Sequence, residues 1–212
     1  MNELENHLRE QIVELSASLY ARGLASRKSG NISVRLDDGW LLTPANTCLG
    51  KLDPARIAKL DWEGKHLAGD SPSEEAYLHR AFYEKRPEAG AIAHLHSSHV
   101  VAVSCMTKLN SKDCIPPLTP YYVMKIGRLP LIPYYRPGDV QLSVEIGWHA
   151  RWHSAVLLAN HGSVVTGANL EAAVDAAEEL EETAKLFLLL QSTSKRQLSA
   201  NQIEELEKML KQ

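Results

Sequence analysis

The sequence contains no apolar run that approaches the roughly 18 residues needed to cross a membrane. It also has no excess of positive charge, because 23 lysine and arginine residues face 26 aspartate and glutamate residues, for a net charge of -3. This balance gives no electrostatic reason to expect nucleic acid or an anionic lipid surface as a partner. We therefore expect neither a membrane protein nor a nucleic-acid-binding protein.

Cysteine is also scarce. Cys48, Cys105 and Cys114 are an odd number, and no two of them form a CxxC pair. This pattern indicates reduced thiols, not a disulfide framework, and it favours a cytoplasmic location. The chain has no repeat and no low-complexity block. Its 212 residues, 44% hydrophobic and 23% charged, predict one globular domain over residues 1–212.

The spacing of apolar residues predicts helices and strands that alternate along the chain. Helices are predicted over residues 4–24, 71–85, 98–106, 139–152, 168–190 and 199–210. Strands are predicted over residues 31–36, 40–43, 57–62 and 89–94, and on either side of residues 159–162. Ser71 with Glu74 fits a capping box for the second helix, and Pro72 suits its first position.

Residues 107–137 differ from the rest of the chain because they hold six of the ten prolines, up to Pro137. One long helix is therefore excluded there, and four tyrosines argue against a disordered linker. We expect ordered loops around a short element. The alternation elsewhere, with an Asp-Gly hairpin turn at residues 38–39, predicts a mixed sheet covered by helices.

Two histidines close an apolar run at His94 and His96. Residues two apart on an extended segment point to the same side, and imidazole is a good ligand for zinc and similar divalent ions. His161 follows a second apolar run, and three histidines with an open position are typical of a catalytic metal site. His99 is expected to be turned away or to support a ligand. The alternative for each of these histidines is a residue of the core whose ring is satisfied by a hydrogen bond.

The predicted helix after residue 71 supplies Glu74, Glu75 and His79. A carboxylate close to a metal can act as a general base, or can ligate the ion until substrate displaces it. The alternative is a solvated helix start. Two polar turns, at residues 29–31 and 43–46, offer backbone N–H groups, hydroxyls and amides to an anion, although simple turn chemistry also explains them.

Taken together and in this order, these motifs resemble the class II aldolase/adducin superfamily over nearly the whole chain. The matching stretches are residues 29–35, 42–44, 73–79, 93–97 and 157–162. The resemblance implies an α/β fold of three layers, α/β/α, with a central, mostly antiparallel mixed sheet flanked by helices. It also implies a homotetramer with active sites at subunit interfaces, acting on a small phosphorylated sugar or sugar acid.

The resemblance also implies roles for particular residues. The implied ligands of one Zn²⁺ per subunit, or of another divalent metal, are His94, His96 and His161. Glu75 matches the catalytic acid of the family and is also an implied fourth ligand. The implied contacts to a substrate phosphate are Asn31, Thr43 and Ser73. Glu74 stands where aldolases of the family often have a second serine.

Two features bear on which member of the family the chain resembles. Aldolases and epimerases of the family use a tyrosine near the C-terminus, whereas the last tyrosine here is Tyr135. Residues 46–56, 118–124, 131–139 and 177–185 look like those of 3-oxo-tetronate 4-phosphate decarboxylases. Such an enzyme would release carbon dioxide and dihydroxyacetone phosphate through a metal-stabilised enediolate.

The proton that completes such a decarboxylation needs a donor. Tyr122 is the first candidate, Tyr121 the second and Glu75 an alternative. Arg136 would hold the substrate carboxylate or phosphate through a bidentate contact, or would instead tie down the adjacent helix start. The other functions considered are a fuculose-phosphate-type aldolase, a methylthioribulose-phosphate-type dehydratase and a non-catalytic adducin-like assembly domain. The intact histidine set argues against the last.

Overall fold

The computed structural model describes residues 3–26, 28–136 and 138–210, so Pro137 lies outside the described residues. The strands within this part are β1 (Asn31–Leu36), β2 (Gly39–Leu42), β3 (Ala58–Leu60), β4 (His66–Ala68), β5 (Ala91–Leu95), β6 (Leu131–Ile132), β7 (Ala155–Leu158) and β8 (Gly162–Gly167). They form one sheet in the order β4-β3-β2-β1-β5-β8-β7-β6. Its pairs are antiparallel apart from β6 with β7. The predicted mixed, mostly antiparallel sheet is confirmed.

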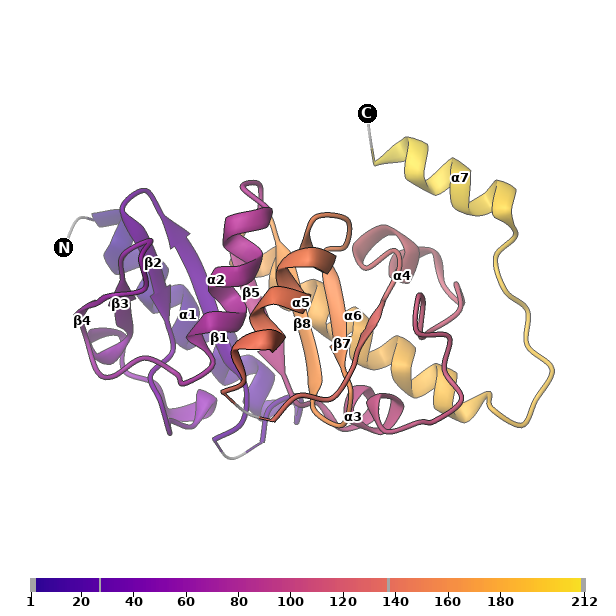
Figure 1. Ribbon diagram of the computed structural model, residues 1–212, viewed down its shortest axis with the longest axis horizontal. Coiled ribbons are helices and arrows are strands. Elements are labelled where there is room, and N and C mark those ends of the chain that lie inside the picture. Colours follow the sequence, from indigo (N-terminus) through magenta and orange to yellow (C-terminus); the bar gives the residue numbers. More distant parts are fainter. Residues whose placement is uncertain (1–2, 27, 137, 211–212) are drawn as a thin grey trace.

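Helices cover both faces of the sheet (Figure 1). They are α1 (Glu3–Ala21), α2 (Ala76–Lys85), α3 (Ser98–Ser104), α4 (Pro120–Lys125), α5 (Val140–Ala150), α6 (Leu170–Leu189) and α7 (Ala200–Met209), with short 3₁₀ turns at Leu49–Lys51 and Pro54–Arg56. In Figure 1, α2 and α5 lie in front of the sheet, and α1 and α6 lie behind it. The expected three layers are therefore present.

The core is split by the sheet into two apolar clusters. Ile32 and Val34 of β1 belong to the cluster that contains residues of α1 and α6. Residues of α2 and α5 pack in the other cluster, with Ile92 of β5 among the sheet residues there. Because side chains alternate along a strand, the residues of β1 between its apolar ones face α2. These residues are polar, which becomes important for the site.

The start of α2 differs from the sequence prediction. The helix begins at Ala76, and Glu75 is its N-cap residue. The preceding segment is extended instead, because Pro72 forms a bridge with Pro44 and the N–H of Ser73 donates to the carbonyl of Thr43. The predicted capping box of Ser71 and Glu74 is therefore wrong. Strand β4 was also not predicted.

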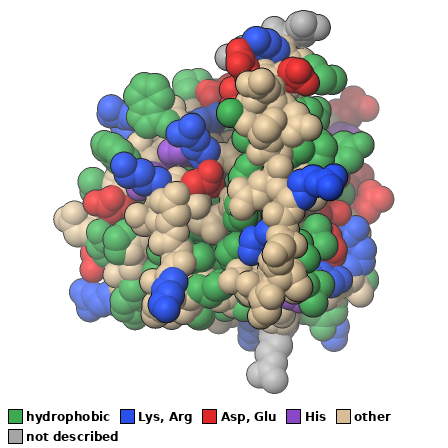
Figure 2. Space-filling model, turned by 90° about the vertical axis from the view of Figure 1, so that its right-hand side faces the viewer, with side chains coloured by type: hydrophobic (Ala, Val, Ile, Leu, Met, Phe, Trp, Pro, Cys, Tyr) green, Lys and Arg blue, Asp and Glu red, His purple; other side chains and the backbone are tan. Residues whose placement is uncertain are grey.

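Helix α7 lies at the upper right of Figure 1, outside the three layers, and contacts α4. It has a capping box formed by Ser199 and Gln202, and the linker before it is tied down where Leu198 donates to the carbonyl of Pro117. Figure 2 looks at this end of the molecule, where the linker runs over the surface below the helix. Within the described ranges, no helix is long and apolar enough to cross a membrane.

Candidate metal centre and substrate cavity

Four predicted site residues meet at one end of the sheet, although they come from three separate parts of the chain. His94 lies in β5, directly opposite Asn31 of β1, and His96 follows one residue after β5 ends. His161 lies in the turn between β7 and β8, and Glu75 caps α2. One ligand atom of each lies within 4.8 Å of those of the others. The structure therefore brings together all four residues proposed as metal ligands.

The ligand atoms converge in pairs. Nε2 of His161 lies 3.1 Å from Oε1 of Glu75, and Nε2 of His94 lies 3.3 Å from Oε2 of the same carboxylate. Nε2 of His96 lies 2.9 Å from Nε2 of His94. The three imidazoles thus present the same ring nitrogen to a common point, beside a carboxylate. Three imidazoles and a carboxylate are a donor set that suits Zn²⁺.

A backbone contact fixes the orientation of the central histidine. Nδ1 of the fully buried His94 lies 2.8 Å from the carbonyl oxygen of Ser163 on β8. A carbonyl can only accept, so Nδ1 carries the proton and donates. Nε2 is then left free to ligate, and metal-bound histidines are typically held by such a second hydrogen bond. The residues present therefore fit a divalent cation.

The charges of the cluster are consistent with metal binding. Burial opposes ionisation of Glu75, but His94 and His161 hold the pKa of its carboxyl well below the usual range. Burial, together with the charges on the same two histidines, lowers the pKa of His96 to about 3. Burial also disfavours charge on His94, but the Glu75 carboxylate raises its pKa above the ordinary value. Near neutral pH the site therefore offers an anionic carboxylate and a neutral His96 ring.

A cavity of about 260 Å³ lies beside Glu75 and His96. Its other lining residues are Lys28, Ser29, Gly30, Asn31, Pro44, Thr47, Ser73, Glu74 and Gly138. Two of the three predicted phosphate contacts, Asn31 and Ser73, line this cavity. Thr43 is not among the described residues that line it; the residue is buried, and its hydroxyl accepts a hydrogen bond from the N–H of Ile32.

Lys28 and Thr47 line the cavity although neither was singled out from the sequence. The available signal for Lys28 is its position, because a cation immediately before a small polar turn suits an anion. No comparable local signal marks Thr47, whose hydroxyl donates to the carbonyl of Pro44 and stabilises the turn there. With these two residues the described lining of the cavity offers hydroxyls, an amide and one ammonium group, beside the carboxylates of Glu74 and Glu75 and the ring of His96.

Gly30 allows the polar turn to approach β5 closely. Its φ is +83°, a conformation that residues with a side chain rarely adopt. A Cβ atom at this position would lie 2.9 Å from the carbonyl oxygen of His94. The glycine therefore lets the turn pack against the backbone of a proposed metal ligand, so that Asn31 faces His94 across the two strands.

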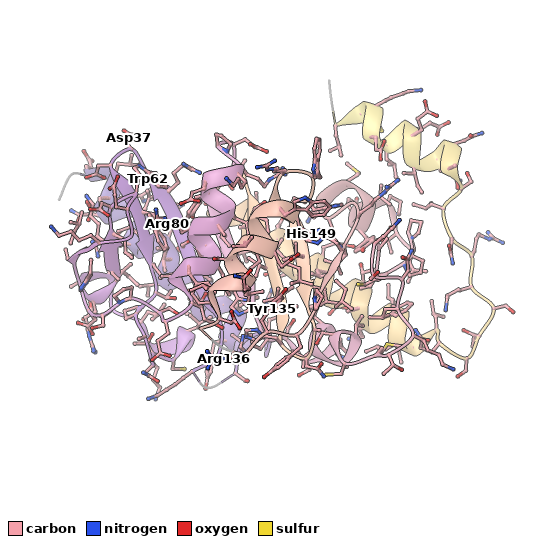
Figure 3. The ribbon with its side chains drawn as sticks, viewed as in Figure 1. Asp37, Trp62, Arg80, Tyr135, Arg136 and His149 are labelled. Atoms are coloured by element: carbon pink, nitrogen blue, oxygen red, sulfur yellow. The ribbon has the colours of Figure 1, made fainter. Side chains whose placement is uncertain are left out.

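Arg136, predicted as a substrate contact, lies at the lower edge of the molecule in Figure 3. Its side chain is 82% exposed, and its Nε lies 4.0 Å from Oδ2 of Asp139, the N-cap residue of α5. His99 is turned away from the cluster, as expected, and its Nδ1 lies 2.8 Å from Oε1 of Glu181. The role of Arg136 stays a prediction.

The two tyrosines predicted as proton donors lie on α4, and neither is among the described residues that line the cavity beside Glu75. Tyr122 is 1% exposed, and its hydroxyl donates to the carbonyl of Ile115 at 3.3 Å. Burial raises its pKa well above the ordinary value. Tyr121 is 64% exposed. The structure of one chain therefore does not bring either tyrosine to the cluster, and their roles stay predictions.

Comparison with known proteins places this site in a family. Residues 10–188 match the model of the class II aldolase and adducin N-terminal domain. A 3-oxo-tetronate 4-phosphate decarboxylase of Pectobacterium atrosepticum is 48% identical over 95% of this chain and 93% of its own length. An L-fuculose phosphate aldolase of Escherichia coli K12 is 35% identical over 86% of this chain and 83% of its own length. The crystal structure of YgbL from Escherichia coli superposes with a TM-score of 0.94 at 44% identity, covering 96% of this chain and 99% of that chain.

Proposed function

The chain belongs to the class II aldolase and adducin family, and we propose on this basis that it converts a 3-oxo-tetronate 4-phosphate to dihydroxyacetone phosphate and carbon dioxide. The observation that carries the proposal is the convergence of Glu75, His94, His96 and His161 beside a polar cavity. The name of the 48% identical relative supplies the substrate and the reaction. A non-catalytic scaffold would have no use for this donor set.

We assign the metal in this reaction as one Zn²⁺ per subunit, which another divalent ion could replace. The cluster of Glu75 and the three histidines would hold it. When bound, the ion supplies a Lewis acid for the negative charge that develops on the substrate oxygens. Glu75 is well placed to respond to substrate, because its carboxylate faces both the histidines and the cavity.

The cavity residues define how the substrate would be held. The phosphate is assigned to Asn31, Ser73 and Lys28 of the cavity lining, which offer an amide, a hydroxyl and an ammonium group. Arg136, close to Gly138 of the cavity wall, is assigned to the substrate carboxylate or phosphate. This placement leaves the 2-hydroxyl and 3-oxo groups next to the four-residue cluster.

The proposed reaction breaks the C1–C2 bond of the substrate. Carbon dioxide leaves, the electron pair of that bond moves towards the C3 carbonyl oxygen, and C2 then takes up a proton. Glu75 is the candidate donor next to the cavity within one chain. Of the two tyrosines on α4, Tyr121 has the exposed ring and is assigned to the site of a neighbouring copy. Tyr122 would have to leave its contact with Ile115.

We also propose that the protein is a cytoplasmic homotetramer with active sites between subunits. Helix α5 supports assembly, because it exposes large apolar side chains at Val140, Val144 and Trp148, each four residues from the next. Such a stripe is typical of a helix face that packs against another surface. The measurement is the mass in solution by light scattering, and a monomer at micromolar concentration would contradict this part of the proposal.

A product assay tests the reaction. The purified protein is incubated with each enantiomer of 3-oxo-tetronate 4-phosphate, with Zn²⁺ and separately with a chelator, and both carbon dioxide and dihydroxyacetone phosphate are measured. We expect both products in equal amounts, only when metal is present. A parallel arm with L-fuculose 1-phosphate tests the aldolase function named for the 35% identical relative. Dihydroxyacetone phosphate without carbon dioxide in that arm, and no turnover in the first, would refute decarboxylation.

A further inference from the structure

The polar residues of β1 match a second set on α2. On β1 these are Asn31, Ser33 and Arg35, two residues apart, and on α2 and its cap they are Glu75, His79 and Tyr83, four residues apart. Two residues of a strand span about 6.7 Å, and four residues of a helix span about 6.0 Å. The two repeats therefore nearly coincide, so that each polar side chain of the strand can meet partners on the helix.

The structure shows a continuous chain of hydrogen bonds between the two elements. Nδ2 of Asn31 donates to Oε2 of Glu75 at 2.7 Å, and Oδ1 of Asn31 lies 2.5 Å from Nε2 of His79. Nδ1 of His79 lies 2.7 Å from Oγ of Ser33, which in turn lies 2.8 Å from the hydroxyl of Tyr83. One unbroken path thus runs from a proposed metal ligand into the buried core.

The direction of every hydrogen bond in this path follows from its end at Glu75. A carboxylate only accepts, so the amide nitrogen of Asn31 must face it and the amide oxygen must face His79. Nε2 of His79 is therefore the donor. Burial lowers the pKa of His79 to about 3, so the ring is neutral and Nδ1 accepts from the Ser33 hydroxyl. Ser33 in turn accepts from Tyr83.

We propose that His79 is a positioning residue for the metal site: by donating from Nε2 it fixes the amide of Asn31, which then holds Glu75 in the place of a ligand. Without this donor, the amide of Asn31 is free to turn its oxygen towards the carboxylate, which would repel Glu75. The inference rests on the proposed function only in taking Glu75 as a ligand. His79 touches neither metal nor substrate, so it acts through Asn31.

The packing of His79 is suited to this role. The residue is fully buried, and its ring stacks on that of Trp40 with centroids 6.1 Å apart and planes 16° apart. Trp40 also contacts the ring of Tyr83. Rotation of the imidazole is therefore opposed by Trp40 on one face as well as by hydrogen bonds at both nitrogens. A side chain fixed in this way can transmit its position to Asn31.

Two substitutions separate positioning from simple packing. In His79→Leu, an apolar side chain fills the space and no donor remains for Asn31. In His79→Gln, the side-chain amide nitrogen can take the place of Nε2 and donate to the same oxygen. Ser16→Ala serves as the control, because Ser16 is equally buried but lies in α1, and its hydroxyl has no hydrogen-bond partner within the described residues.

The first readout is the affinity for Zn²⁺, measured by competition with a chromogenic chelator on the metal-stripped proteins. We expect His79→Leu to weaken binding about 10-fold or more, the usual effect of losing a residue that orients a metal ligand. His79→Gln should recover most of this loss, and Ser16→Ala should match the parent protein. Parent-like affinity in a folded His79→Leu protein, or equal losses in the two His79 variants, would overturn the proposal.

The second readout needs no substitution. Nitrogen-15 NMR of the imidazole distinguishes the two neutral tautomers and the charged ring. We expect the neutral tautomer with the proton on Nε2 for His79 at pH 7, and the other tautomer or an imidazolium would overturn the proposal. Neither readout uses turnover, so a protein that bound Zn²⁺ as expected but released no carbon dioxide would contradict the proposed reaction and leave the role of His79 standing.

Discussion

Replacing His79 by glutamine should make the protein less sensitive to acid, even as it lowers stability at neutral pH. The imidazole is fully buried and neutral, and burial lowers its pKa from 6.5 to about 3. In the unfolded chain the same group takes up a proton near pH 6.5. Between these two values the unfolded state therefore binds one more proton than the folded state, so the free energy of unfolding falls as the pH falls.

The size of the effect follows from the two pKa values. One proton corresponds to about 1.4 kcal/mol per pH unit. Between pH 7 and pH 4.5, the contribution of His79 integrates to a loss of about 2.5 kcal/mol, because the unfolded group is already partly protonated at pH 7. Glutamine does not titrate, so this part of the loss disappears in the variant. Glu75 and His96 titrate in both proteins, so their contributions cancel when the free energies of unfolding of the parent protein and the variant are compared.

The assay is urea unfolding of the parent protein and His79→Gln at pH 7, 6, 5 and 4.5, with a chelator present so that metal release does not add its own pH dependence. We expect the parent protein to lose about 2.5 kcal/mol more than the variant over this range. Ser16→Ala should follow the parent curve in shape. Parallel curves for His79→Gln and the parent would refute the claim that His79 is buried in its neutral form.

Three further predictions concern the site. Adding Zn²⁺ to the metal-stripped protein at 100 times its dissociation constant should stabilise the fold by about 2.7 kcal/mol and raise the melting temperature by about 5–10 °C. His161→Ala should lose most of this gain. An unchanged melting temperature of the parent protein would argue against a metal site. Gly30→Ala should destabilise the protein by about 1–3 kcal/mol and weaken Zn²⁺ binding, because the added Cβ meets the carbonyl of His94. Gly23→Ala is the control: no atom of the described residues lies near an added Cβ there, so this change should affect stability alone. Tyr121→Phe should slow turnover more than Tyr122→Phe, with Zn²⁺ affinity unchanged in both, because the Tyr122 hydroxyl is already bonded to Ile115; the reverse order would identify Tyr122 as the donor.

The metal cluster was the part of the site that the sequence predicted best. The spacing of His94 and His96 on a strand is a local signal, and the family motifs added His161 and Glu75. The start of α2 was predicted wrongly because Ser71 and Glu74 form a good local capping pattern, whereas the bridge between Pro44 and Pro72 depends on residues far apart in the chain. A local sequence pattern does not contain the long-range contact that decides whether residues 71–74 are helical or extended.

The hydrogen-bonded path through His79 is made of residues that are visible in the sequence, but the sequence does not show directly that they contact one another. Polar residues two apart on a strand normally indicate a solvent-facing side, yet Asn31 and Ser33 are buried. Burying such groups is unfavourable unless each has a partner. The partners come from residues four apart on a helix that begins more than 40 residues later, and the two periods coincide only when α2 lies along β1. The motif at residues 29–35 is therefore informative when it is read with Glu75, His79 and Tyr83: one face of the strand packs in the core, and the other sets the position of a metal ligand.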